Sequence, residues 1–477
     1  MKNILILMLF NCGFVLHSKA QETVRFKSSD QAIEKAFVWA KETALSYKGD
    51  PDSPVGAWYE AALPSREAFC MRDISHQSIG AEVLGLGKAN KNMFSLFAKN
   101  ISENKDWCSY WEINKLGNPA PADYRNDKEF WYNLNANFDM IQACWRLYVW
   151  TGDETYIKSP EFIHFYEKSV TDYIERWILE VDSLLTRPMH PNAPIPFDVK
   201  DDFHRCRGLA SYDEDVPDLK MGVDLVASIY SGLVSYSKLL KANGNLEKAA
   251  HYQSKALRYK EQIDQIWWDQ SQALYQTYYT ADGKFGKSGG AIFLLWFNAL
   301  TDETRIQKTI EHIISSKNNV ETSSYLPTLL YQHGFEDKAY QYILYLSNPE
   351  TKRREYPEVS YGIIEGIVSG FMGIEPNSEK NSVTTLYRGK RGTVSELDNL
   401  PVLNTTIAIK QNEQETVFHN KGTKTLLWRA KFAGKHQKFL VNGIKMKTGQ
   451  EDKERGKTYS FIDIPVAEGQ IVTVSCL

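Results

Sequence analysis

Long apolar runs are absent from this sequence after its first twenty residues. No later stretch approaches the roughly 18 consecutive apolar residues that a membrane-spanning helix needs, so we expect no membrane span. Basic tracts are also absent: 56 Lys and Arg residues are interspersed with 59 Asp and Glu residues, and the formal net charge is −3. This balance argues against nucleic acid as a partner.

Cysteine is scarce, and its pattern excludes two kinds of site. Cys12, one of six cysteines, lies in the N-terminal apolar run, which leaves an odd number without any C-x-x-C pair. A disulfide framework and a zinc knuckle are therefore unsupported, and we predict buried free thiols. No glycine-rich phosphate loop, H-E-x-x-H or G-x-S-x-G motif occurs in a supporting context. We predict neither a cofactor nor a metal.

The N-terminus has the pattern of a secretory signal peptide. Lys2 gives a positive start, residues 4–16 are almost wholly apolar, and Ser18-Lys19-Ala20 offers a small-x-small cleavage site. The apolar run is too short to span a membrane. We predict that residues 1–20 are removed and that the mature protein is secreted or periplasmic.

Residues 29–373 have the texture of a helical domain. Apolar residues recur at i, i+3 and i+4 from Ala32 to Ala40, with Ser29 as the expected N-cap. Six polar and aromatic segments stand at or before the starts of predicted helices: residues 66–77, 107–137, 204–215, 275–290, 321–325 and 353–365. Six such segments among about a dozen helices favour six helical hairpins closed into a ring, with all six segments at one end. An open solenoid is the alternative, but the segments lack the fixed period that a solenoid needs.

The last hundred residues differ in texture. Short runs of alternating and β-branched residues occur at 402–409, 425–432, 438–441, 459–464 and 471–474, separated by turns such as Asn442-Gly443. This pattern predicts a small β-sandwich. The predicted fold is therefore mainly α: an (α/α)6 barrel over residues 21–375, followed by a C-terminal β-sandwich over residues 376–477.

Three of the six segments carry crowded carboxylates, which suit the cleavage of glycosidic bonds. One carboxyl group protonates the leaving oxygen, and the other activates water or attacks the sugar. The first group is Arg66, Arg72, Asp73 and His76, in which Asp73 and His76 share a helical face. A structural Arg–Asp pair at a helix start is the alternative.

The second group is a run of acids, in which mutual repulsion could raise one pKa as a general acid requires. Simple capping of a helix N-terminus is the alternative. The group comprises Tyr212, Asp213 and Glu214, preceded by His204, Arg205 and Arg207.

The third group is Glu358, Tyr361 and Glu365, which share a helical face at i, i+3 and i+7, with Arg354 before them. Glu365 lies in an otherwise apolar stretch, where a buried carboxylate without a purpose is costly. We therefore expect Glu358 or Glu365 to be functional.

A weaker group lies in residues 107–137. Its aromatic and amide side chains fit a sugar subsite, and they fit the core between two helices equally well. It comprises Trp111, Glu112, Trp131 and Asn133.

The last predicted barrel helix ends in Gly373-Ile374-Glu375-Pro376. With this turn the chain resembles the six-hairpin glycosidase superfamily, whose rhamnosidase-like members end their last barrel helix in a similar Gly-Ile-x-Pro turn before a β domain. Residues 66–73 are similar to the acidic first-hairpin motif of these members. The resemblance covers residues 30–477 and implies the fold more specifically than the substrate.

Some bacterial members of the superfamily look like β-glucuronidases, and arginines recur at the predicted hairpin tips of this chain. Arginine matches a carboxylate with bidentate geometry, which motivates a uronide hypothesis. The arginines are Arg66, Arg72, Arg205, Arg207, Arg353 and Arg354.

The main hypothesis is an exported glycoside hydrolase that acts on oligosaccharides or polysaccharides. Asp213 or Glu214 and Glu358 or Glu365 are the expected acid and base, supported by Asp73. We expect inversion, with the two carboxyl groups about 6.5–9.5 Å apart.

Two other functions stay open. A polysaccharide lyase would abstract a proton next to a uronate carboxylate with Tyr361, His76 or His204 as base. A non-catalytic, sugar-binding helical protein would keep its ligand when the acids are replaced.

Overall fold

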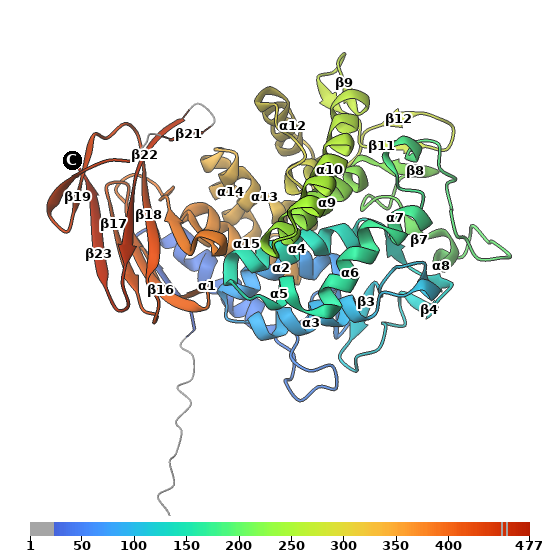
Figure 1. Cartoon of the computed structure of the whole chain (residues 1–477), viewed down its shortest axis with the longest axis horizontal. Coiled ribbons are helices and arrows are strands. Elements are labelled where there is room, and N and C mark those ends of the chain that lie inside the picture. Colours follow the sequence, from blue (N-terminus) through green and yellow to red (C-terminus); the bar gives the residue numbers. More distant parts are fainter. Residues whose placement is uncertain (1–22, 450–451, 455–456) are drawn as a thin grey trace, which may run out of the picture.

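The computed structural model describes residues 23–449, 452–454 and 457–477, so the predicted signal peptide lies outside the described residues. A helical part and a β part lie side by side, with the β part at the left of Figure 1. None of the helices in the described ranges is long and apolar enough to cross a membrane.

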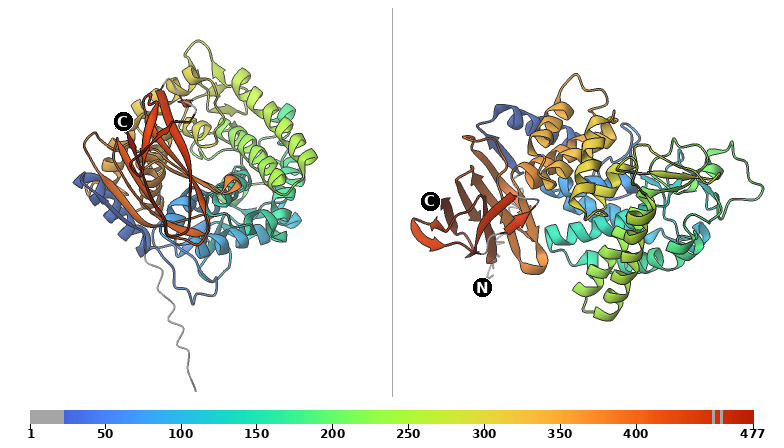
Figure 2. Two further views of the ribbon diagram at one scale, coloured as in Figure 1. Left: turned by 60° about the vertical axis from the view of Figure 1, so that its left-hand side comes forward. Right: turned by 90° about the horizontal axis from the view of Figure 1, so that it is seen from above.

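Six inner helices form a closed ring in the helical part. Each contacts the next in the order α2, α4, α9, α11, α13 and α15, and α15 returns to α2. The left view of Figure 2 shows the helices arranged around this ring. The closed ring confirms the predicted (α/α)6 barrel and excludes the open solenoid. The inner helices are α2 (Met71–Val83), α4 (Ala136–Thr151), α9 (Val223–Ala242), α11 (Ala291–Trp296), α13 (Val320–Gln332) and α15 (Pro357–Glu365).

An outer helix packs behind each inner one. The outer helices bury a single stripe, as α10 does with Ala249, Ala256, Tyr259 and Ile263, whereas the inner helices are buried almost all round. The outer helices are α3 (Gly87–Lys99), α6 (Pro160–Val170), α10 (Leu246–Ile266), α12 (Glu303–Ser315), α14 (Glu336–Ser347) and α1 (Gln31–Ser46). Shorter helices are α5 (Thr155–Lys158), α7 (Asp172–Arg176) and α8 (Asp202–Arg205), with a π-helical turn at Gly366–Phe371 and 3₁₀ turns at Glu103–Lys105, Val181–Ser183 and Ser378–Lys380.

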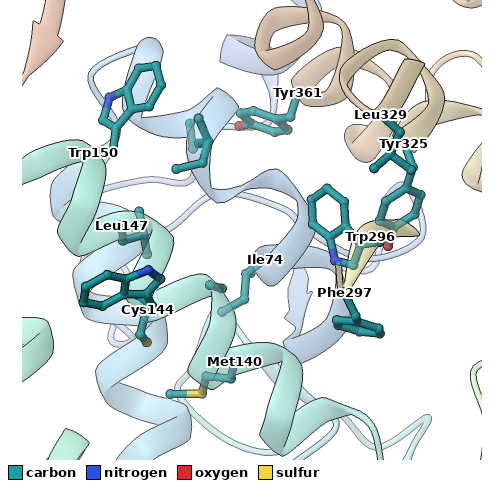
Figure 3. Packing of buried hydrophobic residues seen from close by; sticks show 14 of the residues in the cluster. Ile74, Met140, Cys144, Leu147, Trp150, Trp296, Phe297, Tyr325, Leu329 and Tyr361 are labelled. Atoms are coloured by element: carbon teal, nitrogen blue, oxygen red, sulfur yellow. The ribbon is translucent and has the colours of Figure 1, made fainter. Parts of the chain in front are cut away.

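Glycines let neighbouring inner helices approach closely. A Cβ on Gly362 of α15 would lie 2.5 Å from the carbonyl oxygen of Ser324 on α13, and one on Gly80 of α2 would lie 2.5 Å from that of Tyr361. Larger side chains then fill the interior, and Figure 3 shows Ile74, Met140 and Tyr361 among them.

The predicted cap of the first helix is one residue off. The carboxylate of Asp30, not the hydroxyl of Ser29, accepts N–H bonds from Ala32 and Ile33, and α1 begins at Gln31. Both residue types are favoured N-caps, so the sequence could not choose between neighbours. Helix α4 ends at Thr151, and Gly152 after it has φ of +70°, the left-handed conformation that favours glycine.

Two sheets form the sandwich. The first has the order β1-β15-β16-β17-β23-β19-β20 and the second β13-β14-β18-β22-β21. The strands are β1 (Arg25–Ser28), β13 (Ile374–Asn377), β14 (Ser382–Thr385), β15 (Ser395–Val402), β16 (Thr405–Gln411), β17 (Glu415–Asn420), β18 (Leu426–Ala433), β19 (Lys438–Val441), β20 (Ile444–Lys447), β21 (Asp452–Glu454), β22 (Lys457–Val466) and β23 (Ile471–Cys476).

Two features of the sandwich differ from the sequence prediction. Strand β1 pairs with β15, so residues 25–28 complete a sheet that the sequence pattern places in residues 376–477 alone. The predicted strand 402–409 is interrupted at Leu403 and Asn404. Their φ values of +50° and +56° form the tight turn that connects β15 to β16. Apolar residues on both sides concealed this turn.

The sandwich contacts the C-terminal end of α4 and follows α15 through the π-helical turn. Trp150 at the end of α4 donates its indole N–H to the carbonyl of Pro401 at 3.1 Å and accepts from the backbone of Leu403. The N-terminal ends of the inner helices therefore face away from the sandwich.

Short strands tie the polar segments together at this free end. Pairs β2–β3, β6–β7 and β8–β11–β12 join segments that are far apart in sequence, and they lie at the right of Figure 1. These strands are β2 (Ala68–Cys70), β3 (Glu112–Asn114), β4 (Tyr124–Asn126), β5 (Glu129–Phe130), β6 (Tyr132–Asn133), β7 (Arg207–Leu209), β8 (Leu219–Gly222), β9 (Trp268–Asp269), β10 (Leu274–Tyr275), β11 (Tyr278–Thr280) and β12 (Phe285–Gly286).

Candidate active site

A cavity of about 220 Å³ lies at the N-terminal ends of the inner helices, where the polar segments meet. Helices α2, α11, α13 and α15 and the loop before α9 contribute its walls. The lining residues are Arg72, Asp73, His76, Tyr212, Asp213, Glu214, Asp215, Gly289, Gly290, Phe293, Asn319, Glu321, Thr322, Tyr325 and Glu358. Acidic side chains from four separate segments therefore share one small space.

Arg72 connects two of these carboxylates. Its Nε lies 3.4 Å from Oδ1 of Asp73 and its Nη1 lies 3.9 Å from Oε1 of Glu214, while the guanidinium group lies over the ring of Tyr212. Burial raises the pKa of Asp73 to about 6 against the opposing charge of Arg72, and Glu321 and Glu214 add to the rise. Asp73 therefore titrates close to neutral pH.

Glu358 is the most deeply buried acid of the cavity. It lies in the first turn of α15, where Pro357 begins the helix, and it is 7% exposed. Burial, together with the nearby charges of Asp73 and Glu321, raises the pKa of Glu358 well above its usual range. This carboxyl group is protonated where an exposed glutamate is ionised.

Glu214 is more exposed than Glu358 and has polar neighbours. Its Oε1 accepts an N–H from Asn133 at 3.0 Å, and Asn133 also donates to the carbonyl of Ser211, which fixes the loop. Burial raises the pKa of Glu214, while Arg72 and Asn133 act in the opposite direction. Beside it, Oδ2 of Asp213 is buried without a partner among the described residues.

Aromatic rings close the bottom of the cavity. His76 stacks on Tyr325 with ring centroids 3.6 Å apart and meets the edge of Trp296 at 5.3 Å. Burial and the charges of Arg146 and Arg72 hold the pKa of His76 well below its usual range, so its imidazole is neutral. Neutral rings at the base suit contact with the apolar face of a sugar.

Comparison with known proteins agrees with the fold. A family model described as Trehalase matches residues 211–334, which include α9, α11 and α13. The α-L-rhamnosidase from Dictyoglumus thermophilum is 12% identical with a TM-score of 0.62, over 95% of this chain and 50% of that one. The chain has the six-hairpin glycosidase fold.

Two further solved structures share this fold. The GH78 family rhamnosidase of Bacillus sp. GL1 is 14% identical with a TM-score of 0.58, over 84% of this chain and 40% of that one. A putative kojibiose phosphorylase from the human microbiome is 8% identical with a TM-score of 0.53, over 94% and 68%. This six-hairpin chain thus spans half or less of the two rhamnosidases. No curated protein matches it in sequence.

Within the six-hairpin fold, Glu365, the other predicted candidate on α15, does not line the cavity. It stands two turns beyond Glu358 on α15, and its Oε1 pairs with Nη2 of Arg146 from α4 at 2.5 Å. Burial raises the pKa of Glu365, and Arg146 opposes this rise. This buried carboxylate forms an ion pair across the barrel.

Most of the predicted arginines are also structural. Arg66 pairs with Glu112 at 2.5 Å and with Asp123 at 3.2 Å, and Arg207 is buried against Asp106. Arg205 pairs with Asp202, and Arg354 donates to the carbonyl of Ser347 and lies over Trp39. None of these four arginines, all within the described ranges, lines the cavity.

The other predicted binding residues also lie behind the cavity wall or outside it. His204 pairs with Glu129, and Tyr361 donates its hydroxyl to the carbonyl of Ala44. Trp111 packs beneath the guanidinium of Arg72, and Trp131 donates to Asn133, which in turn holds Glu214. Trp111 and Asn133 therefore support the site from behind, and Glu112 belongs to the Arg66 pair.

Glu321 and Tyr325 also line the cavity, although the sequence pattern marks only their segment, 321–325, and neither residue individually. Both are on α13, four residues apart, and so lie on the same side of the helix. An acid in the first turn of a helix is ordinarily explained by the helix dipole, so the sequence gives no separate signal that Glu321 faces a cavity.

The assignment of Glu365 to structure gives a testable contrast. We expect Glu365→Gln to leave kcat/KM within about twofold of wild type. It should lower the free energy of unfolding by about 1.5–3 kcal/mol, because a charge-assisted hydrogen bond to Arg146 is weakened. Urea denaturation and steady-state rates measure the two effects, and a large loss of activity at unchanged stability would contradict the assignment.

Proposed function

We propose that the protein is a glycoside hydrolase with Glu358 as general acid and Glu214 as general base. One observation carries the proposal: two carboxyl groups line the same small cavity, and their surroundings favour the protonated form of Glu358 and the ionised form of Glu214. Glu358 is buried against like charges, whereas Glu214 lies beside Arg72 and an amide N–H. Such a difference between two carboxyl groups is typical of acid and base assignments.

In the proposed reaction, Glu358 gives its proton to the glycosidic oxygen as the bond between this oxygen and the anomeric carbon breaks. Glu214 takes a proton from a water molecule whose oxygen bonds to the anomeric carbon. We propose inversion of configuration, which NMR of the first-formed product anomer tests directly. Arg72 positions Glu214 and Asp73 during the reaction.

The lining charges favour a neutral sugar over a uronide. Six acidic side chains line the cavity, and Arg72, its one arginine, already faces Asp73 and Glu214. A uronate carboxylate would meet these acids without a free cation among the lining residues. The likeness to a putative kojibiose phosphorylase suggests phosphorolysis as an alternative reaction. A phosphate dianion would also meet the six acidic side chains without a free cation among the lining residues.

The deciding experiment offers the purified mature protein a panel of aryl glycosides and oligosaccharides, including a glucuronide, with and without inorganic phosphate. Release from a neutral glycoside that does not depend on phosphate supports the proposal. Dependence on phosphate would make the protein a phosphorylase, and new ultraviolet absorbance from an unsaturated product would make it a lyase. If no product forms from any substrate of the panel and Glu358→Gln still binds sugar, a non-catalytic binding protein would be favoured.

The pH dependence gives a second test of the assignment. Activity should fall as pH drops through the pKa of Glu214, which must be ionised, and as pH rises through the pKa of Glu358, which must be protonated. Because the charge of Asp73 raises the pKa of Glu358, Asp73→Asn should move the alkaline limb of kcat/KM to lower pH by about one unit. An alkaline limb that stays in place would contradict this pairing, and Asp218→Asn, an exposed residue of the same loop as Glu214, is the control.

A further inference from the structure

A second cavity, of about 370 Å³, lies deeper along the barrel, toward the C-terminal ends of the inner helices. It opens between α4, α9, α11 and α13, and we name it the basal cavity. Its lining residues are Gln142, Trp145, Arg146, Tyr230, Ser231, Val234, Ser235, Lys238, Trp296, Phe297, Asn298 and Gln332. The proposed hydrolysis uses none of these residues.

The inner part of the basal cavity holds polar atoms that have no partner in the part of the chain that the structure describes. Gln142 is 6% exposed; its amide N–H donates to the carbonyl of Trp296 at 3.0 Å, while its Oε1 is unpartnered among the described residues. Nη1 of Arg146 is likewise buried without a partner, although Nη2 pairs with Glu365. Buried polar atoms of this kind ordinarily find a hydrogen-bond partner, so the unpartnered pair points to a ligand.

The walls and the rim add aromatic faces and a second cation. The guanidinium of Arg146 lies 4.6 Å from the ring centroid of Trp296, and Nζ of Lys238 lies 5.7 Å from that of Trp145. Lys238, Asn298 and Gln332 are exposed at the rim, which gives access from solvent. No acidic side chain is among the lining residues, whereas six line the catalytic cavity. Glu365 pairs with Arg146 from behind the wall, and Glu379 acts on Lys238, so the charge of Lys238 and the open Nη1 of Arg146 are what this cavity offers to an anion.

We propose that the basal cavity binds a small carboxylated sugar. Arg146 and Lys238 would hold the carboxylate, the amides of Gln142, Asn298 and Gln332 would bind hydroxyl groups, and the indole rings would cover the apolar face of the ring. The two cavities share a wall, because Trp296 also contacts Tyr325 (Figure 3) and His76. The binding proposal does not depend on the proposed hydrolysis.

Calorimetric titration of the folded protein with glucuronate, glucose and inorganic phosphate tests this site. We expect glucuronate to bind more tightly than the other two, and Lys238→Met to weaken its binding about tenfold, since a hydrogen bond to a charged group is lost. Lys241→Met is the matched control, because Lys241 is exposed one turn further along the same helix. Arg146 is kept, since its removal would leave Glu365 without its partner.

Arg72→Met separates the two cavities. If glucuronate binding is lost in Arg72→Met and unchanged in Lys238→Met, the ligand occupies the catalytic cavity and the proposal is overturned. Equal binding of glucose and glucuronate, binding of phosphate alone, or no binding of any probe would each overturn it as well.

Discussion

Replacing Glu358 with glutamine should lower kcat by about 10²–10⁴-fold while KM changes little, the usual scale of general acid catalysis. Glutamine keeps the shape of the side chain and its hydrogen-bonding capacity but has no proton to give to the leaving oxygen. Burial within the cavity and the neighbouring charge of Asp73 keep the native carboxyl group protonated. The same surroundings cannot supply a proton once the carboxyl group is replaced by an amide. Steady-state rates on a hydrolysed aryl glycoside measure the effect.

The leaving group sharpens this test. A substrate whose leaving group departs without protonation should be affected far less by Glu358→Gln than one with a basic leaving group. The control is Glu355→Gln, three residues earlier and exposed, which should keep wild-type activity. Equal losses for both leaving groups would show that Glu358 has another role.

The sequence predicted which end of the barrel carries the site, and the reason is topological. Polar segments stand before the inner helices, and the inner helices all run in the same direction around the closed ring. Their N-terminal ends therefore meet at one end of the barrel, whatever the details of packing. This argument needed helix starts and polar composition alone, and it brought Asp73, Glu214 and Glu358 into one cavity.

The choice between Glu358 and Glu365 could not be made in this way. The two residues share a helical face, but seven residues correspond to about 10.5 Å along a helix. One carboxylate therefore reaches the cavity, and the other lies deep in the barrel beside Arg146. Helical periodicity predicts the face of the helix on which a residue lies, but not which end of the barrel that residue reaches.

The arginines show a second limit of sequence reasoning. Arg207 and its partner Asp106 are 101 positions apart, and Arg66 and Glu112 are 46 apart, so neither pair is visible in a local pattern. A cluster of arginines at hairpin tips has the same sequence pattern whether the arginines bind a ligand or pair with distant acids. The sequence therefore favoured the uronide hypothesis, although acids of the chain pair with Arg66 and Arg207.

The second large effect concerns Glu214. Glu214→Gln should also reduce kcat by about 10²-fold or more, because glutamine cannot accept a proton from the attacking water. Its hydrogen bond with Asn133 can persist through the side-chain oxygen, so the loop before α9 should keep its conformation. Rates in single-turnover experiments separate this chemical effect from changes in product release.

Comparison with Asp213→Asn distinguishes the two neighbouring acids. Oδ2 of Asp213 is buried and without a partner among the described residues, so it is placed to accept a substrate hydroxyl, and Asp213→Asn should raise KM more than it lowers kcat. If instead Asp213→Asn abolishes turnover while Glu214→Gln retains it, the base is Asp213. The acid would still be Glu358, because its burial against like charges does not depend on which member of the loop activates the water.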